Sequence, residues 1–399
     1  MTKTLLLLGG SAAQVAAIEA AKRAGYRTVL CDYLPDNPGR LVADSFHQVS
    51  TTDPIAVLEV ARSEDVDGVV AYSSDPAAPT AAYVADALAL PGVPYGVARA
   101  FCEKHLFRAF LSEHGFNVPV SISCRIGDLP DISGMSLPVI VKPTDSSGSK
   151  GVAVVESVNS LAEALESASD FSRNGILEIE EFIVRDHPHV IEAEIFVKDG
   201  EVVSWGLMNS IRDEGSNPLL PAGYTMPLDQ PANRVRLVKE EVARLVGATG
   251  VRDGAFNIEM VIDASDRLFF LDAGPRNGGN MLPEFISMAS GTDIVDATVR
   301  AAMGDLSGMD LTFDGASCGC WGLGVLHSSC AGEYEGISYS DLARNCLVRE
   351  EIQVKPGDRV RPFERCNDLL GLSFFKFSSK EESDEVMLDM AKSMGPVLR

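Results

Sequence analysis

Residues 254–276 read GAFNIEMVIDASDRLFFLDAGPR, and this stretch holds two apolar segments that each carry an isolated acid. The pattern predicts two β-strands, Phe256–Ile262 and Leu268–Asp272, joined by a short turn. Such a hairpin brings Glu259 and Asp272 side by side, although they are 13 positions apart in the chain. Adjacent carboxylates repel each other and favour a bound cation, and Mg²⁺ takes one or two carboxylates together with phosphate oxygens. The stretch therefore predicts a two-carboxylate magnesium site on a β-hairpin.

A lysine and a glycine- and serine-rich loop indicate a phosphate site further upstream. Pro138–Lys142 reads as a buried apolar strand that ends in a lysine, whose ammonium group needs an anion at the rim of the core. The next loop, Ser146-Ser147-Gly148-Ser149-Lys150-Gly151, is small-sided and rich in free backbone N–H groups, which suits it to fold over phosphates. Such a loop alone is usually a plain hairpin turn, but beside Lys142 it indicates phosphate binding. Arg276 is placed either to meet a transferred phosphoryl group or to form a structural salt bridge.

The segment Ile176–Ile183 is an apolar strand with two consecutive carboxylates, Glu180 and Glu181. Because a strand alternates its faces, the two side chains cannot both point inward. One use of such a strand is a purine clamp, in which a carboxylate accepts from the exocyclic amino group and backbone atoms read the ring edge. The alternative, which the strand taken alone favours, is an edge strand with solvated acids.

The chain divides by its pattern into a head and a body. Strands alternate with helices over residues 1–97, which predicts a parallel sheet with right-handed crossovers, a Rossmann-like α/β domain. A helix over Ala98–His114 opens the region 98–312, where strands are frequent and hairpin-like, with a small lobe at about 120–185. Residues 313–399 read as short strands and a last helix, Lys380–Ser393, that complete an α+β body.

Composition limits the possible classes of function. A chain of 399 residues suggests two or three domains, and its net charge of −23 argues against nucleic-acid binding, because an acidic surface repels phosphate backbones. No apolar run approaches the roughly 20 residues of a membrane helix, and Thr4–Leu8 lacks a signal-peptide cleavage site, so we expect a cytoplasmic protein with no membrane partner. Cys318, Cys320 and Cys330 lack the C-x2-C pair of a zinc site, which favours free thiols.

Taken in this order, these elements resemble the ATP-grasp superfamily from residue 4 to about residue 300. That family has a Rossmann-like N-terminal domain followed by a two-lobed body that grips ATP. The resemblance implies ATP and Mg²⁺ as cofactors, with Lys104 and Lys142 on the phosphates, covered by the loop 146–151. It implies that Glu180 meets the adenine amino group, while the backbone of Glu181 and Ile183 reads the ring. It also implies that Glu259 and Asp272 are the metal ligands.

Two departures from the family pattern concern the metal. Asp272 stands where a glutamate is usual, and Gly274 replaces the usual asparagine ligand. Magnesium is then held with more water, or by Asn277 or Asn280. Family members also carry a ribose-binding acid just past the hinge, a region that Asp186 and His187 occupy here. A metal site at His187-Pro-His189 is a weaker alternative, since it lacks a third ligand.

Residues for the other substrates are less clearly marked. Gly9–Ala12, which includes Gly10, and Ser73-Ser74-Asp75 follow strands of the head, and ligands of open sheets bind at the carboxyl ends of strands. The segment Arg212–Pro227 is long for a connection, so we expect a lid that carries Arg212 and Tyr224 over the second substrate. Arg212 then either holds an anionic group or is solvated.

The reaction implied by this resemblance is ATP-dependent ligation of a carboxylate to an amine through an acyl phosphate, with ADP and phosphate released. Arg276 and Lys142 are the expected catalytic residues, and the partners are a small-molecule carboxylate and amine. The family is often dimeric, so a homodimer is one assembly to consider. Three alternatives remain: a bicarbonate-activating carboxylase of the same fold, a non-catalytic ATP-binding protein, and a nicotinamide-dependent oxidoreductase. The last is disfavoured because Gly9-Gly10 is not followed by a full G-x-G-x-x-G fingerprint.

Overall fold

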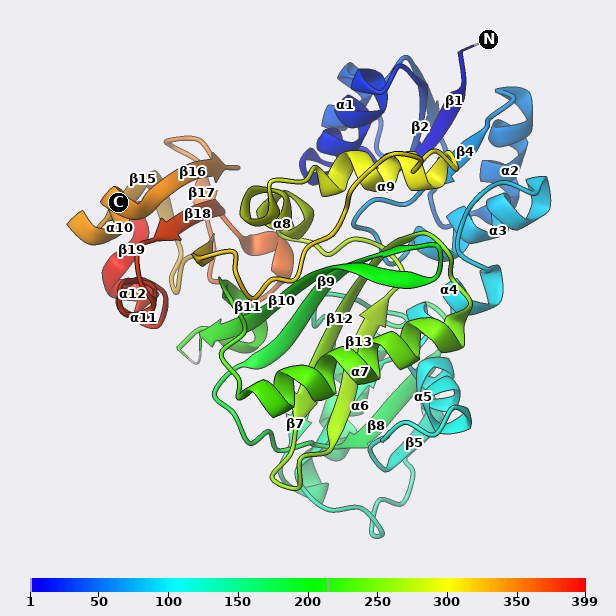
Figure 1. Cartoon of the computed structure of the whole chain (residues 1–399). Helices are drawn as coiled ribbons and strands as arrows, with labels where there is room; N and C mark the ends of the chain where they lie inside the picture. Colours follow the sequence, from blue (N-terminus) through cyan, green and yellow to red (C-terminus); the bar gives the residue numbers. More distant parts are fainter. Residues whose placement is uncertain (1, 214) are drawn as a thin grey trace.

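A computed structural model describes residues 2–213 and 215–399 and confirms a mixed α/β and α+β architecture (Figure 1). The head is a parallel sheet in the order β3-β2-β1-β4. Its elements are β1 (Thr4–Leu8), α1 (Val15–Arg23), β2 (Arg27–Asp32), β3 (Ser45–Gln48), α2 (Pro54–Ser63), β4 (Gly68–Val70) and α3 (Ala78–Leu88). All five residues of β1 are buried, as an apolar strand covered by helices on both faces requires.

One helix that covers the head comes from much later in the chain. Helix α9 (Ile294–Ala302) lies beside α1, and its Val295 and Val299 pack with Leu5, Leu7 and Ile18 on one face of the head sheet (Figure 1). Helices α2 and α3 cover the opposite face. The sequence places α9 in the body, but its apolar face completes the core of the head.

The small lobe is a four-stranded antiparallel sheet in the order β5-β8-β6-β7 with one helix packed on it. Its elements are β5 (Ser121–Arg125), β6 (Val139–Pro143), β7 (Ala153–Val155), α6 (Leu161–Ser169) and β8 (Ile176–Glu181).

An eight-stranded sheet forms the large lobe, in the order β13-β12-β9-β10-β11-β14-β18-β16. The strands are β9 (Val190–Lys198), β10 (Glu201–Asp213), β11 (Asn217–Met226), β12 (Gly254–Ile262), β13 (Leu268–Gly274), β14 (Cys320–Leu326), β16 (Leu347–Ile352) and β18 (Gly371–Phe377). Around them lie α7 (Ala232–Thr249), α8 (Leu282–Ser290), α10 (Asp341–Cys346), α11 (Lys380–Met387), α12 (Met390–Ser393) and the small sheet of β15 (Gly332–Tyr339), β17 (Arg359–Val360) and β19 (Met394–Leu398). The C-terminal strands β14, β18 and β16 thus extend the same sheet.

The two faces of this sheet have different surroundings. Helix α7 packs on one face, where Val238 and Val242 meet alternate residues of β9 and β12 such as Ile195 and Phe256. The other face carries the acids of β9, β12 and β13, and looks toward α8 and the head.

Three expected elements differ from the structure. The predicted lid is wrong: Arg212 lies in β10, and most of the segment is strand β11, which pairs with β10 and β14. Pro218 and Pro221 suggested a loop, but they lie in the half of β11 that pairs with β10 alone, beside a register shift where proline is tolerated. The helix expected over 98–114 is broken into α4 (Tyr95–Cys102) and α5 (Lys104–Glu113) by the extended backbone of Glu103. The last helix is likewise split into α11 and α12.

Along the described residues, no helix combines the length and the apolar character needed to cross a bilayer.

Candidate active site

Three carboxylates form a row across neighbouring strands of the large lobe. Asp272 on β13 is the register partner of Glu259 on β12, and Glu259 is in turn the partner of Glu192 on β9. The hairpin expected from the sequence therefore forms, and the row contains one acid more than the sequence indicated. Glu192 is 2% exposed, and its pKa is raised well above the usual value by burial and by the charge of Glu259.

Two of these acids, Asp272 and Glu259, are each paired with a cation from another element. Lys104, at the start of α5, lies with its Nζ 3.2 Å from Oδ2 of Asp272. Arg212 on β10 places Nη2 3.2 Å from Oε1 of Glu259. Burial alone would raise the pKa of Asp272, but Lys104 and Lys142 hold it below the usual value, so this carboxylate is ionised. The break before α5 thus turns Lys104 toward the acid row.

Arg276 is fixed by a second pair of side chains, which lies two residues along the strands from the acid row on the same face of the sheet. Asn257 on β12 is the register partner of Glu194 on β9, and its Oδ1 accepts from Nη1 of Arg276 at 3.0 Å. On its other side Arg276 pairs with Asp75 of the head, with Nη2 2.5 Å from Oδ1. The pKa of Arg276 is raised because Asp75 outweighs the effect of burial. Arg276 therefore connects the head to the acid-bearing sheet.

Glu194 holds the loop that follows Arg276. Its carboxylate accepts from the Gly278 amide at 2.8 Å and from Nδ2 of Asn277 at 3.1 Å. Burial raises the pKa of Glu194 to about 8. Asn277, which the sequence offered as a metal ligand, is buried and turned toward Glu194. It therefore supports the loop through its Nδ2 atom, and its suggested role as a metal ligand stays a prediction.

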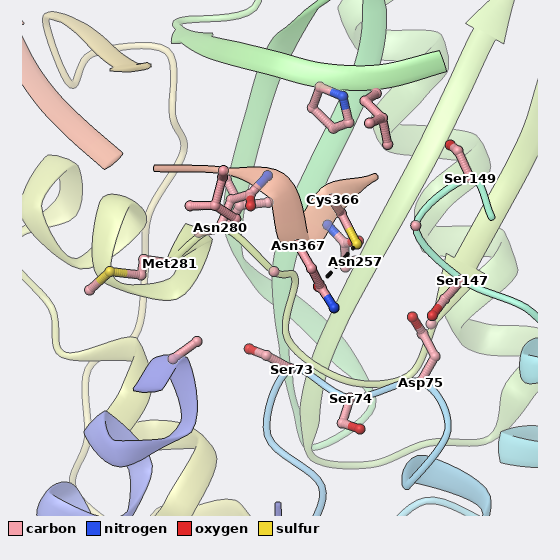
Figure 2. A pocket seen from close by; sticks show the side chains of 18 of the residues that line it. Ser73, Ser74, Asp75, Ser147, Ser149, Asn257, Asn280, Met281, Cys366 and Asn367 are labelled. Atoms are coloured by element: carbon pink, nitrogen blue, oxygen red, sulfur yellow. Dashed lines mark hydrogen bonds between the residues drawn. The ribbon is translucent and has the colours of Figure 1, made fainter. Parts of the chain in front are cut away.

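A cavity of about 490 Å³ between the head, the phosphate loop and the C-terminal part is lined by five of these residues: Glu192, Asn257, Glu259, Asp272 and Arg276. Figure 2 shows Ser73, Ser74 and Asp75 of the head, Ser147 and Ser149 of the loop, and Cys366 of the C-terminal part around it. A second cavity of about 370 Å³ lies beside Lys104 and Ser146. Both cavities are lined by Asp75, Ser147 and Asp272, so they meet at the acid row.

The phosphate loop rests on both the sheet and the C-terminal part. Ser149 donates to the Leu219 carbonyl on β11 at 2.9 Å, and the Ser146 carbonyl accepts from Lys104 at 3.1 Å. Gly148 has a left-handed backbone (φ +66°), and a Cβ added there would lie 2.5 Å from Sγ of Cys366. Gly151 is also left-handed, packed against Phe171. Only glycine fits at Gly148 with the loop in this position.

Lys142 and Glu180 form a buried ion pair with Arg108. Glu180 Oε2 lies 2.6 Å from Lys142 Nζ, and Oε1 lies 2.7 Å from Arg108 Nε. Burial opposes ionisation of Glu180, but the two cations lower its pKa to about 2. Burial lowers the pKa of Lys142 to about 8. Glu181 points away and meets the Ser136 amide, so only one of the two acids faces inward, as alternation predicts.

This pairing changes the interpretation of Glu180. The sequence suggested that its carboxylate accepts from an adenine amino group, but in the structure it is shared by Lys142 and Arg108. Arg108 also donates to the carbonyls of Phe270 at 3.2 Å and Leu271 at 2.8 Å on β13. Glu180 and Arg108 therefore join the small lobe to the large lobe.

His187 is engaged by the backbone. Its Nε2 accepts from the Ile262 amide at 2.9 Å, and its Nδ1 lies against the His189 carbonyl. Burial lowers the pKa of His187, in keeping with a neutral ring. Both ring nitrogens are thus engaged by the backbone, which argues against the metal site with His189, whereas the suggested ribose contact stays a prediction. Throughout the described part of the chain, no group of three or more metal-ligating side chains forms, and Cys318, Cys320 and Cys330 are free.

Only some of the suggested substrate residues line the larger cavity. Ser74 and Asn280 line the larger cavity, and Asn280 donates to the Tyr224 hydroxyl at 3.2 Å. Arg212 lies in the sheet behind Glu259. Gly10 does not line the cavity: its amide donates to Asp32 at 2.7 Å and a Cβ there would strike Asn37, so it shapes the turn that presents Ser11.

Four important residues had no role in the sequence interpretation: Arg108, Glu192, Glu194 and Asn257. Glu192 and Glu194 carried a signal, because they alternate within the apolar strand Val190–Val197 and so share one face. Arg108, one turn of helix after Lys104, also shares a face with that lysine. The partners of these residues depend on tertiary register, which spacing alone does not give.

The residues present fit a divalent cation. Glu259 and Asp272 are adjacent on one face, both line the cavity, and their side chains are 30% and 44% exposed. Carboxylate oxygens are the ligands that Mg²⁺ prefers, with the remaining positions taken by water and phosphate. Asn257 and Asn280 line the same cavity, whereas Gly274 offers no side chain.

The chain was compared with known protein families and sequences. The profile of the family described as "Carbamoyl-phosphate synthase L chain, ATP binding domain" matches residues 103–307. The carbamoyl phosphate synthase large chain of Micrococcus luteus is 25% identical over 303 residues, which cover 73% of this chain and 27% of that protein. The formate-dependent phosphoribosylglycinamide formyltransferase of Synechococcus sp. is 25% identical over 293 residues, 71% of this chain and 72% of the relative. The chain thus spans about a quarter or less of the synthase large chains that it matches.

Solved structures share the fold over the whole chain. The L-amino acid ligase of Bacillus licheniformis superposes with a TM-score of 0.83 at 20% identity, covering 100% of this chain and 99% of the other. The biotin carboxylase domain of the 2-oxoglutarate carboxylase of Hydrogenobacter thermophilus, solved with MgADP and bicarbonate, gives a TM-score of 0.72 at 16% identity, with coverage of 97% and 89%.

Proposed function

Since the chain belongs to the carbamoyl-phosphate synthase L chain ATP-binding domain family, an ATP-grasp family, we propose that it is an ATP-dependent ligase that joins a carboxylate to an amine through an acyl phosphate. The observation that carries this proposal is the register pair Glu259–Asp272, with Arg276 beside it, at the meeting point of two cavities. In this proposal the two acids hold a metal, Lys104 and Lys142 meet the phosphates, and Arg276 meets the transferred group.

Lys104 and Lys142 bind the phosphates of ATP in this proposal, and the loop 146–151 covers them. Both lysines are held by acids in the structure, Lys104 by Asp272 and Lys142 by Glu180. Mg²⁺, when bound by Glu259 and Asp272, supplies charge neutralisation for the phosphate oxygens. We propose that the backbone of Glu181 and Ile183, where β8 ends, binds the edge of the adenine ring.

The chemical step needs positioning and charge stabilisation rather than a protein nucleophile. An oxygen of the substrate carboxylate attacks the γ-phosphorus, and ADP leaves with the electrons of the broken P–O bond. Arg276, oriented by Asp75 and Asn257, stabilises the charge on the transferred phosphoryl group. The amine nitrogen then attacks the acyl carbon, and phosphate leaves as the amide bond forms.

The comparisons support the fold and the ATP-binding family, and the activity rests on the site geometry, because the chain spans only part of the synthase relatives. The cytoplasmic location and the homodimer stay predictions.

The test is ADP and phosphate release from the purified chain with MgATP, challenged by pools of carboxylates crossed with pools of amines. Release that needs one acid and one amine together, without AMP, supports the ligase. Release with bicarbonate alone would replace it with a carboxylase. ATP binding without release from any pool would favour a non-catalytic ATP-binding protein.

A further inference from the structure

The 490 Å³ cavity has two sides of different character. One side carries the acid row, Arg276 and the phosphate loop, which the proposed reaction uses for the metal and for ATP. The other side comes from the head, from the loop before α8 and from the C-terminal part, and the proposed chemistry uses none of its side chains. These side chains therefore face the part of a substrate that lies away from the reacting atoms.

This second side offers neutral hydrogen-bonding groups. Ser74, Asn280 and Asn367 line the cavity (Figure 2); Ser74 and Asn280 are half-buried, and Asn367 is exposed. Asn280 uses Nδ2 on the Tyr224 hydroxyl at 3.2 Å, which leaves its Oδ1 as an acceptor. Asn367 uses Oδ1 on the Cys366 thiol at 3.4 Å, which leaves its Nδ2 as a donor. Together with the Ser74 hydroxyl, which can donate and accept, these groups suit the hydroxyls of a ligand.

The cavity offers little to a phosphate group on a substrate. Among the described residues that line it, the cations are Lys150 and Arg276. Arg276 is already paired with Asp75 and bonded to Asn257, and Lys150 belongs to the phosphate loop. A substrate phosphate would thus lose its hydration without meeting a free cation. The lining therefore favours a substrate that carries no phosphate.

The charges of the lining also indicate which substrate carries the hydroxyls. The acids among the described lining residues outnumber these two cations: Asp75, Glu192, Glu259 and Asp272. Bound MgATP would add further negative charge. Such a site attracts an ammonium group and repels a second carboxylate. The hydroxyl-bearing substrate is therefore the amine.

Apolar side chains line the same cavity. Leu219, Met281 and Leu369 are half-buried there. A sugar ring has C–H faces that pack on such side chains and hydroxyls at its edge that bond to the amides and the serine. A hydrocarbon ring of the same size would displace water from these polar groups without replacing its hydrogen bonds.

We propose that the amine substrate is an amino sugar without a phosphate group, whose hydroxyls meet Ser74, Asn280 and Asn367. The inference rests on the proposed ligase and names the class of its second substrate. The head and the C-terminal part then act together in specificity, because each supplies a side chain to the same ligand.

Calorimetric titration of the chain saturated with Mg²⁺ and a non-hydrolysable ATP analogue tests this inference. The probes are D-glucosamine, D-galactosamine and D-mannosamine, the 6-phosphate of each, and cyclohexylamine, a six-membered ring without hydroxyls. We expect at least one amino sugar to bind about 10-fold or more tightly than cyclohexylamine, because the hydrogen bonds of several hydroxyls add together. The 6-phosphate of that sugar should bind more weakly than the sugar itself.

Two variants assign the contacts. Asn367→Leu and Ser74→Ala each remove one neutral hydrogen bond, so each should weaken the best amino sugar about 3- to 10-fold and leave cyclohexylamine unchanged. Asn159→Leu, at an exposed asparagine of the small lobe, is the matched control. A merely structural role would weaken both probes alike and lower the unfolding temperature, which would contradict the assignment.

Amino sugars that all bind no more tightly than cyclohexylamine, or a 6-phosphate that binds more tightly than its parent sugar, would overturn the inference. ADP release that needs an acid together with an amine lacking hydroxyls would overturn it while the ligase proposal stands. Absence of ADP release with every acid and amine pool would instead reject the ligase, whatever the sugars do.

Discussion

Glu259 on β12 and Asp272 on β13 stand directly opposite each other, and each is held by a cation from a distant part of the chain, Arg212 and Lys104. The two ion pairs balance the negative charges of these acids. In the proposed mechanism, binding of Mg²⁺ and phosphates exchanges these partners: the metal takes the acids and the phosphates take Lys104. This exchange links metal binding to phosphate binding.

Removing either acid should raise the Mg²⁺ requirement. Glu259→Gln and Asp272→Asn each delete a charged ligand, so we expect the apparent Mg²⁺ affinity to fall by more than the roughly 10- to 100-fold lost with outer-sphere partners. The measurement is ATP turnover, or nucleotide binding, across a Mg²⁺ titration. Asp266→Asn, an exposed acid in the turn of the same hairpin, is the control. An unchanged Mg²⁺ dependence in both active-site variants would contradict the metal assignment.

Nucleotide binding should weaken as the pH rises through about 8. Burial lowers the pKa of Lys142 to about 8, so the free protein loses this positive charge above that pH, while bound phosphates favour the charged form. Binding above pH 8 must then take up a proton, which calorimetry in two buffers of different ionisation enthalpy detects. Lys142→Arg keeps its charge and should abolish the proton uptake. Equal uptake in both proteins would assign the titration to another group.

Arg108 should be a major contributor to stability. Arg108→Met leaves buried Glu180 with one cation and removes the donors to the Phe270 and Leu271 carbonyls. Loss of one partner of a buried charge costs about 3–5 kcal/mol, which chemical denaturation measures. The double variant Arg108→Met/Glu180→Gln should recover part of that loss. Additive losses in the double variant would show that the two side chains act independently.

The left-handed backbone of Gly148 allows the loop to pack against Cys366. Gly148→Ala places a methyl group against Sγ of that residue, so we expect a raised KM for ATP with the unfolding temperature little changed. Gly175→Ala is the matched control, since Gly175 is also left-handed but has open space around its Cα. Gly148→Ala/Cys366→Ala should restore part of the affinity. Equal effects of the two single glycine variants would indicate backbone strain rather than the contact.

Local patterns were enough to predict much of this fold. Apolar strands bounded by turns marked the hairpin of β12 and β13, and alternation of strands with helices marked the parallel head. The segment 212–227 misled because its prolines and glycines are typical of loops, while its pairing with β10 and β14 is a long-range property. Helix α9 similarly covers the head through contacts that no local pattern encodes.

Sequence patterns indicated the site residues that lie close together in the chain. They did not indicate ion pairs between residues that meet only through tertiary packing. Glu259, Asp272 and Arg276 lie near one another in the sequence and were found together. Glu180 was assigned to a ligand because its partners, Lys142 and Arg108, come together only when the small lobe packs on β13.

The most direct test of the central claim uses a carboxylate substrate labelled with ¹⁸O, taken from the acid pool that supports ADP release together with an amine. The acyl phosphate route transfers one ¹⁸O atom from the carboxylate to inorganic phosphate, which mass spectrometry detects, and it forms no AMP. Label found in AMP, or phosphate that carries no label although amide is formed, would contradict the proposed mechanism.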